Sequence, residues 1–433
     1  MLNKAISLIG SSVNNYVVEP LKKSNVKSTA IIAIALVSLS LSSCKKDFSG
    51  GDAFGNRSTA AADYAASSLP VVSVPAGNIT TSVHWTAGNV YELSGVVVVT
   101  GGGHLEIDPG TFIKSSVNTP GSANGVLVIA KDGTIDAVGD ECNPIVFTSR
   151  RLLDGNNSTV GAPGDFGGII ILGDAPINTP TGSANIEGLD ATDARFTYGG
   201  VDDTDNRGNF QNVRIEYAGY QLAANIEVNG LTLGGVGSGT TVNNVETAWG
   251  LDDGFEFFGG TVSTSDLLAY ANDDDQFDFD LGYTGTLSNS AAIANNASTH
   301  SGLPGTADSN GAEIDNSVAN PCGTTLTTTV TFENVSIWGT SAAASAGLYE
   351  NGIHVRRGAT LIVSGSTVTG YNRGVFVEAS AGACEAGLVG DSRIHGFVTP
   401  GNYTDLGGNT TSVTDPASWF PASFSRCWAK FDY

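Results

Sequence analysis

The chain has 433 residues, of which 56 are glycine and 15% are charged, and its formal net charge is −23. This charge argues strongly against a nucleic-acid partner, because contacts to phosphate need clustered lysine and arginine. An acidic surface also repels anionic lipid, so contact with a membrane must come from something other than charge. A chain of this length could form two or three ordinary domains, or one elongated unit built from repeats.

The N-terminal region has the pattern of an export signal. Three lysines within residues 22–27 precede an apolar run over residues 30–41, which is too short to cross the core of a bilayer comfortably. The run leads into Leu-Ser-Ser-Cys at residues 41–44, which resembles the bacterial lipobox that is cleaved before a lipid-modified cysteine. We therefore expect residues 1–43 to be a signal peptide and Cys44 to be lipidated. The alternatives are an ordinary signal with an incidental cysteine, or a start codon placed too far upstream.

After the cysteine, residues 44–69 are rich in Ala, Ser and Gly and have no hydrophobic periodicity, which is typical of a flexible tether. Regular structure is expected from about Val71. Short apolar runs then follow one another, each bounded by Gly, Pro, Asp or Asn, as short strands should be. They include residues 96–100, 105–107, 126–129, 145–148 and 169–172. No convincing long amphipathic helix follows residue 44.

An acidic-aromatic phrase occurs twice, 22 residues apart: Asp-Asp-Gly-Phe-Glu-Phe at 252–257 and Asp-Asp-Gln-Phe-Asp-Phe at 274–279. A repeat of this length suits one rung of a solenoid. In each copy two phenylalanines flank a carboxylate, so a strand would send both rings to one face and the acid to the other. We expect Phe255 and Phe277 to stack inside adjacent rungs, with a ladder of carboxylates outside.

The same spacing returns later in the chain, between residues 352–355 and 374–377. Period-2 alternation, short turns and a rung of about 22 residues together predict an all-β fold, a parallel β-helix, over residues 70–414. Longer insertions would project from one side of it as loops, at residues 150–166, 178–210 and 296–325.

The C-terminal stretch, residues 415–433, differs in composition because it is rich in tryptophan and phenylalanine. Solenoids need a cap over the open edge and apolar interior of the last rung. We expect this stretch to be that cap; the alternative is a secretion or sorting signal.

Besides Cys44, the chain has four cysteines, and in an exported protein four thiols allow three full pairings. Cys322 and Cys384 both lie in Gly/Ala-rich turn segments, which favours that pair. No two cysteines have the spacing of metal ligands.

Several phrases, taken together with both acidic-aromatic copies, resemble a family of predicted surface lipoproteins common in Bacteroidota. They lie at residues 105–111, 168–178, 213–219 and 229–240. The resemblance covers most of residues 80–430 and implies a right-handed parallel β-helix on a lipid anchor. It brings no established activity, so no catalytic residues can be carried over.

The expected location is the outer membrane, with the lipid as the contact to the membrane. Lys45-Lys46-Asp47 matches the acidic export signals of Bacteroidota only in part. The sequence therefore favours anchoring more than it favours display on the cell surface.

The acidic ladder is the leading candidate for chemistry. Adjacent rungs lie about 4.8 Å apart, and like charges at that distance repel by roughly 1 kcal/mol even in water. Ca²⁺ would turn this repulsion into binding, because it takes six to eight oxygen ligands in irregular geometry. The expected ligands are Asp252, Asp253, Glu256, Asp274, Asp275 and Asp278. The alternative is a set of solvated turn aspartates that accept backbone N–H bonds.

Two classes of function compete. The preferred one is a non-catalytic binding or scaffold lipoprotein that engages glycan or protein partners. The other is a Ca²⁺-dependent polysaccharide lyase or glycoside hydrolase, with Asp274 and Asp275 as a carboxylate pair beside Arg356 and Arg357. His354 is expected to point outward as a surface residue. A carbohydrate platform could use aromatic residues, most of which could equally pack in the core: Trp85, Tyr198, Tyr217, Tyr220, Trp249, Tyr270, Tyr283 and Trp338.

Overall fold

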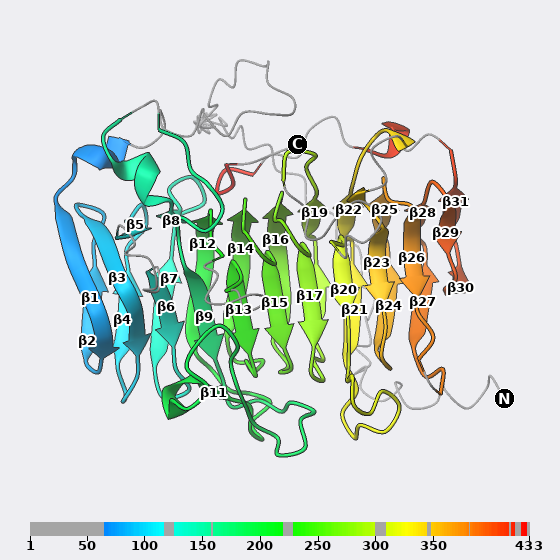
Figure 1. The fold of residues 1–433 in the computed structure, drawn as a ribbon, viewed down its shortest axis with the longest axis horizontal. Coiled ribbons are helices and arrows are strands. Elements are labelled where there is room, and N and C mark those ends of the chain that lie inside the picture. Colours follow the sequence, from blue (N-terminus) through cyan, green and yellow to red (C-terminus); the bar gives the residue numbers. More distant parts are fainter. Residues whose placement is uncertain are drawn as a thin grey trace, which may run out of the picture. The chain divides into compact units, whose positions relative to one another are not determined.

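The computed structural model describes residues 65–116, 125–156, 159–219, 228–298, 309–343, 348–380, 382–414, 417–420 and 426–430. All of them belong to one compact unit, residues 49–433. Their strands form a right-handed parallel β-helix, as the sequence predicts (Figure 1). The chain visits three parallel sheets in turn, and each circuit is one rung.

The bounds of the strands follow the three sheets. Sheet 1 contains β2 (Ser82–Trp85), β4 (His104–Ile107), β7 (Thr134–Val138), the first halves of β12 (Gly208–Glu216), β14 (Thr241–Ala248) and β16 (Thr264–Tyr270), then β18 (Thr286–Ser288), β21 (Thr329–Glu333), β24 (Thr360–Ser364), β27 (Ala386–Gly390) and β30 (Thr404–Gly407). Sheet 2 contains the first halves of β1 (Val71–Ile79) and β3 (Val90–Val99), β5 (Phe112–Ser115), β8 (Ile145–Thr148), the second halves of β12, β14 and β16, then β19 (Ala291–Ile293), β22 (Ser336–Trp338), β25 (Thr367–Thr369), β28 (Arg393–His395) and β31 (Thr410–Ser412). Sheet 3 contains the ends of β1 and β3, β6 (Val126–Ile129), β9 (Gly168–Leu172), β13 (Leu231–Gly234), β15 (Phe255–Phe258), β17 (Phe277–Asp280), β20 (Ala312–Ile314), β23 (Asn351–Val355), β26 (Arg373–Val377) and β29 (Thr399–Gly401).

A column of left-handed residues turns the chain from sheet 1 into sheet 2. Asn212, Asn244 and Asp266 have φ of 52°, 54° and 54° and bend β12, β14 and β16 at equivalent positions. Asn and Asp adopt this conformation more readily than other non-glycine residues. The side chains also connect the rungs, since Asn244 Nδ2 donates to Asn212 Oδ1 at 3.0 Å. The corner therefore follows directly from residue type.

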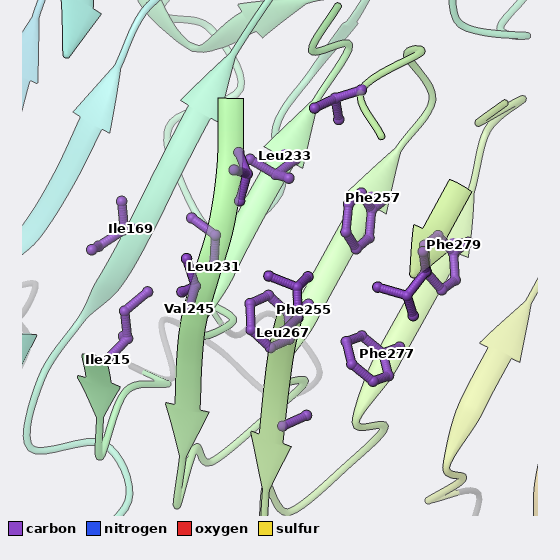
Figure 2. Packing of buried hydrophobic residues seen from close by; sticks show 14 of the residues in the cluster. Ile169, Ile215, Leu231, Leu233, Val245, Phe255, Phe257, Leu267, Phe277 and Phe279 are labelled. Carbon is purple, nitrogen blue, oxygen red and sulfur yellow. The ribbon is translucent and has the colours of Figure 1, made fainter. Parts of the chain in front are cut away.

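The interior of the coil is a stack of apolar side chains, shown in part in Figure 2. The rings of Phe255 and Phe277 lie 5.3 Å apart, and those of Phe257 and Phe279 lie 4.6 Å apart, both pairs in stacked geometry. The predicted stacking of Phe255 on Phe277 is thus confirmed. Burial of such rings is the main driving force for the fold.

The insertions leave the coil at two corners rather than from one side, which corrects the sequence-based expectation. The β8–β9 insertion, with a 3₁₀ turn at Arg150–Leu153, leaves between sheets 2 and 3. The β9–β12 insertion leaves between sheets 3 and 1 (Figure 1, green loops at the bottom). The predicted insertion at residues 296–325 contains β20 and is therefore two segments. Residues 299–308, before β20, lie outside the described residues, and the β20–β21 segment also leaves between sheets 3 and 1 (Figure 1, yellow loop at the bottom). The β9–β12 insertion also contains a 3₁₀ turn, Ala194–Phe196, and an antiparallel hairpin of β10 (Ala184–Asn185) and β11 (Thr197–Tyr198). Its apolar residues cover part of the outer face of sheet 3.

Of the predicted cap, residues 415–433, the structure describes residues 417–420 and 426–430, and these pack against the outside of sheet 2. A 3₁₀ turn, Ala417–Trp419, brings the ring of Trp419 to 6.1 Å from that of His395 on β28. Trp428 is 3% exposed and packs on the outer face of sheet 2, in a cluster with Leu268, Ala291, Ile293 and Trp338. We call residues 417–420 and 426–430 the C-terminal strap, because they run back along the side of the coil.

Two disulfides cross the fold. One joins Cys322, after β20, to Cys384, before β27. The other joins Cys142, between β7 and β8, to Cys427 in the strap. The first is the pair favoured on sequence grounds. The whole predicted signal peptide, residues 1–43, lies outside the described residues, as do Cys44 and the predicted tether up to residue 64. The rest of the predicted tether includes a 3₁₀ turn, Ala65–Ser68, which precedes β1.

Candidate functional site

The two acidic-aromatic phrases lie one above the other on sheet 3. Strand β15 pairs with β17 so that Phe255 is opposite Phe277 and Glu256 is opposite Asp278. The next strand, β20, continues the column with Glu313 opposite Asp278. Because side chains alternate along a strand, the rings point into the coil and the carboxylates point out of it.

These outward carboxylates are nevertheless buried, which the sequence did not predict. The exposed fractions are 8% for Asp253, 5% for Glu256, 5% for Asp275 and 6% for Glu313. Asp252, Asp274 and Asp278 are only partly exposed. The alternative of solvated turn aspartates therefore fails on exposure, although its hydrogen bonding is present in part.

The side-chain oxygens of the turn residues accept a series of hydrogen bonds, each from the rung that follows. The N–H of Asp253 donates to Asn229 Oδ1 at 3.2 Å, and the N–H of Asp275 donates to Asp253 Oδ1 at 2.9 Å. The N–H of Asn310 donates to Asp275 Oδ1 on the following rung. Asn351 Nδ2 in turn donates to Asn310 Oδ1 at 2.7 Å. One oxygen of each turn aspartate thus aligns the rung that follows.

The strand acids have fewer fixed partners. Glu256 accepts a hydrogen bond from Asn229 Nδ2. Asp278 Oδ1 is buried and has no hydrogen-bond partner in the part of the chain that the structure describes. A buried oxygen without a donor is costly, so this position is suited to a cation or a proton.

All six predicted ligands come together, and Glu313 joins them. The acids form three overlapping groups of three, and within each group one oxygen of every member lies within 4.8 Å of one oxygen of the other two. The groups are Asp252, Asp253 and Asp274; Asp253, Glu256 and Asp278; and Asp275, Asp278 and Glu313. Only oxygen donors are present, as a hard cation such as Ca²⁺ requires. Glu313 was not among the ligands expected from the sequence.

The electrostatics of the cluster follow from burial. Burial raises the pKa of Asp253, Glu256 and Asp278 well above the usual carboxyl range, and neighbouring carboxylates raise it further. Burial and then the charge of Glu313 raise the pKa of Asp275 in the same way. At the end of β17, burial raises the pKa of Asp280 to about 7, helped by the charge of Asp315. Without a cation, burial and mutual repulsion favour the protonated form of these groups.

Positive charge borders the cluster on one side. Arg356 Nη2 lies 2.5 Å from Glu313 Oε1, and its Nε lies 3.3 Å from Asp315 Oδ2. Arg357 also pairs with Asp315. Both arginines are thereby engaged by carboxylates on β20 and at its end.

His354 is not the surface residue that alternation predicted. It points out of the coil, but it is 5% exposed. Its Nε2 lies 2.8 Å from Glu378 Oε2, and its ring lies 5.4 Å from that of Phe376 on the next rung. Neighbours on the adjacent strand therefore cover it.

Most residues of the expected aromatic platform are buried. Six of its eight residues are buried: Trp85, Tyr198, Tyr217, Trp249, Tyr283 and Trp338. Tyr270 is half-buried and packs beside the strap, and Tyr220 lies outside the described residues. A glycan could not stack on the six buried rings as they stand.

The chain belongs to the family of pectate-lyase-like β-helix domains, whose sequence model matches residues 77–411. Comparisons with curated proteins and with solved structures give no match. Among the described residues, no helix has the length and apolar character needed to cross a membrane.

Proposed function

We propose that this chain is a non-catalytic lipoprotein of the cell envelope that binds glycan or protein partners through the loops and faces of its β-helix. The observation that supports it is the burial of the acidic cluster, whose members Asp253, Glu256, Asp275 and Glu313 are at most 8% exposed. A polysaccharide-cleaving site must admit the sugar to its carboxylates. Arg356 and Arg357, the nearest candidates for a base, are held in ion pairs.

The test is a screen of the purified protein on a panel of polysaccharides with Ca²⁺, in which reducing ends and unsaturated products are followed. The same panel is cast in affinity gels to detect binding, and envelope extracts are cross-linked to find protein partners. We expect the protein to be retarded in a polysaccharide gel or to form specific cross-links to an envelope protein, and we expect no reducing ends or unsaturated sugars to be released. Turnover that disappears in the double variant Asp274→Ala/Asp275→Ala would overturn the non-catalytic assignment.

The proposed location is the outer membrane, through a lipid on Cys44. The support is the run of lysines, the short apolar segment and the lipobox-like end at residues 41–44. The variant Cys44→Ala should leave the membrane fraction and accumulate as an unprocessed precursor. If it stays membrane-bound and is processed normally, the anchor lies elsewhere. Protease treatment of whole cells then distinguishes the cell surface from the periplasm.

We also propose that the acidic cluster holds Ca²⁺ as a structural ion. Asp253, Glu256 and Asp278 would supply carboxylate oxygens, and so would Asp275 with Glu313. The buried Asp278 Oδ1 supports this, because a cation would satisfy it. The ion would supply charge neutralisation and cross-link consecutive rungs.

A Ca²⁺-dependent polysaccharide lyase or glycoside hydrolase remains the second candidate. Two observations favour it: the family is defined by likeness to pectate lyase, and Arg356 lies beside carboxylates of the cluster. The polysaccharide screen separates the two candidates, because only an enzyme gives product.

A further inference from the structure

A second cluster of ligating side chains lies far from the acidic ladder in sequence, on the first rungs of sheet 1. His84 on β2 is directly opposite Glu106 on β4, 22 residues later. Val83 and Trp85 beside it pair with Leu105 and Ile107, which are in the core. By alternation, His84 and Glu106 therefore point out of the coil on the same face.

Asp108 completes a group of three. It follows β4 immediately, and its Oδ1 lies 2.7 Å from His84 Nε2. One ligand atom from each of His84, Glu106 and Asp108 lies within 4.8 Å of the other two. Ligands about 2.0–2.2 Å from a tetrahedral Zn²⁺ are roughly 3.3–3.6 Å from one another. The three side chains need only small rotations to reach that spacing.

The backbone that carries these side chains is well fixed. The N–H of Asp108 donates to the carbonyl of Trp85 at 2.9 Å, and Thr111 Oγ1 donates to the carbonyl of Asp108 at 2.7 Å. Trp85 is itself buried and stacks on Tyr91 at 4.8 Å. Metal sites built on strands in this way are more precise than sites on loops.

We propose that His84, Glu106 and Asp108 form a surface site for a divalent transition metal, with Zn²⁺ as the best match. An imidazole nitrogen with two carboxylates suits Zn²⁺, whereas Ca²⁺ prefers oxygen ligands alone. The side chains of His84 and Asp108 are 48% and 39% exposed, so solvent can deliver the ion and supply a fourth ligand. The bound ion would join β2 to β4 at the start of sheet 1, where the sheet has an edge.

A neighbouring pair provides the matched control. His104, also on β4, has its Nε2 3.7 Å from Asp136 Oδ2. Its Nδ1 is 2.9 Å from Thr134 Oγ1, and Asp136 accepts a hydrogen bond from Asn209 Nδ2 at 2.7 Å. In the described part of the chain His104 belongs to no three-ligand group. Removing this imidazole therefore tests for general histidine binding on the same face.

The experiment is calorimetric titration of Zn²⁺ into the metal-stripped full-length protein, with excess Ca²⁺ present so that the acidic ladder is occupied. We expect one saturable site, weakened at least tenfold in His84→Ala and in Asp108→Asn, and changed less than twofold in His104→Ala. Zn²⁺ should raise the melting temperature of the wild type and of His104→Ala but not of His84→Ala. Circular dichroism without Zn²⁺ confirms that each variant is folded.

Three results would overturn the site. The first is a wild type with no saturable binding. The second is equal affinity in the wild type and His84→Ala. The third is an equal loss in His104→Ala, which would assign binding to histidines in general.

Discussion

Asp253 Oδ1 accepts a hydrogen bond at 2.9 Å from the backbone N–H of Asp275, one rung further along the coil. The bond itself needs no negative charge, because the amide oxygen of Asn229 accepts the equivalent bond from the backbone N–H of Asp253 on the preceding rung. The negative charges of Asp253 and Asp275 are therefore not needed for the hydrogen bonds of the turns. This makes their removal an informative test of the proposed cation.

The first prediction concerns chelation. If Ca²⁺ occupies the ladder, EDTA should lower the melting temperature, because an ion at a hundredfold excess over its Kd adds about 2.7 kcal/mol to the free energy of unfolding. The variant Asp253→Asn/Asp275→Asn keeps the turn hydrogen bonds and should lose the response to EDTA. Asp190→Asn, at an exposed turn that binds Thr192, should keep the response. If EDTA has no effect while the double variant melts higher than the wild type, the carboxylates of the ladder bind no Ca²⁺ and only repel one another.

The second prediction concerns pH and Asp280. Its pKa is about 7 in the folded chain, against 3.8 for an ordinary aspartate, which we take for the unfolded chain. Between these pH values the folded chain therefore binds the proton more tightly. The free energy of unfolding should fall as pH rises from 4 towards 7, by on the order of 4 kcal/mol from this group. Urea unfolding in EDTA at pH 4 and pH 8 measures the fall. It should be smaller in Asp280→Asn, and an unchanged fall would assign the effect to other acids.

The third prediction concerns the aromatic stack. Phe257 is fully buried and stacks on Phe279 at 4.6 Å, so Phe257→Ala leaves a cavity inside the coil. The loss should be about 3–5 kcal/mol in the free energy of unfolding, measured with urea. Leu406, which is 60% exposed on β30, serves as the control, and Leu406→Ala should change stability by less than about 0.5 kcal/mol. Comparable losses in both variants would contradict the assigned core.

The fourth prediction concerns the C-terminal strap. Besides Cys427, it is held by Lys430, whose N–H donates to Glu246 Oε2 at 2.9 Å and whose Nζ lies 3.6 Å from the buried Glu216. Cys142→Ser/Cys427→Ser should loosen the strap, shift the fluorescence of Trp428 to longer wavelength and expose Lys430 to trypsin. Cys322→Ser/Cys384→Ser should leave that cleavage site protected. Equal cleavage in the two variants would show that the disulfide between Cys142 and Cys427 does not secure the strap.

Local pattern was sufficient to predict the coil. Alternation and the 22-residue spacing placed Phe255 over Phe277, because a rung contacts only its neighbours in sequence. The same spacing relates His84 to Glu106, which sequence analysis overlooked because the two lie in unlike segments. An insertion between rungs, as between Asp278 and Glu313, breaks the 22-residue spacing. The sequence then no longer indicates which residues are paired.

Burial outside the coil could not be predicted in this way, because it depends on segments that return from far along the chain. The strap, which packs on sheet 2, is such a segment. His354 was missed for another reason: alternation gives the direction of a side chain but not its cover, and Phe376 and Glu378 on the next rung cover it. A signal for the strap did exist. The three residues of β19, Ala291–Ile293, are all apolar, which indicates that both faces of that strand are covered. The pattern does not identify the segment that covers the outer face.

The bond between Cys142 and Cys427 also determines how the coil responds to force. Repeat structures ordinarily unravel from an end, one rung at a time, when the chain is pulled. Here the two cysteines are 285 residues apart, and β8 to β31 all lie between them. A pull on the two chain ends passes through the sulfur atoms and bypasses those strands. Only the rungs before Cys142 then carry the load, and they include β2 and β4, which the metal bound by His84 would join.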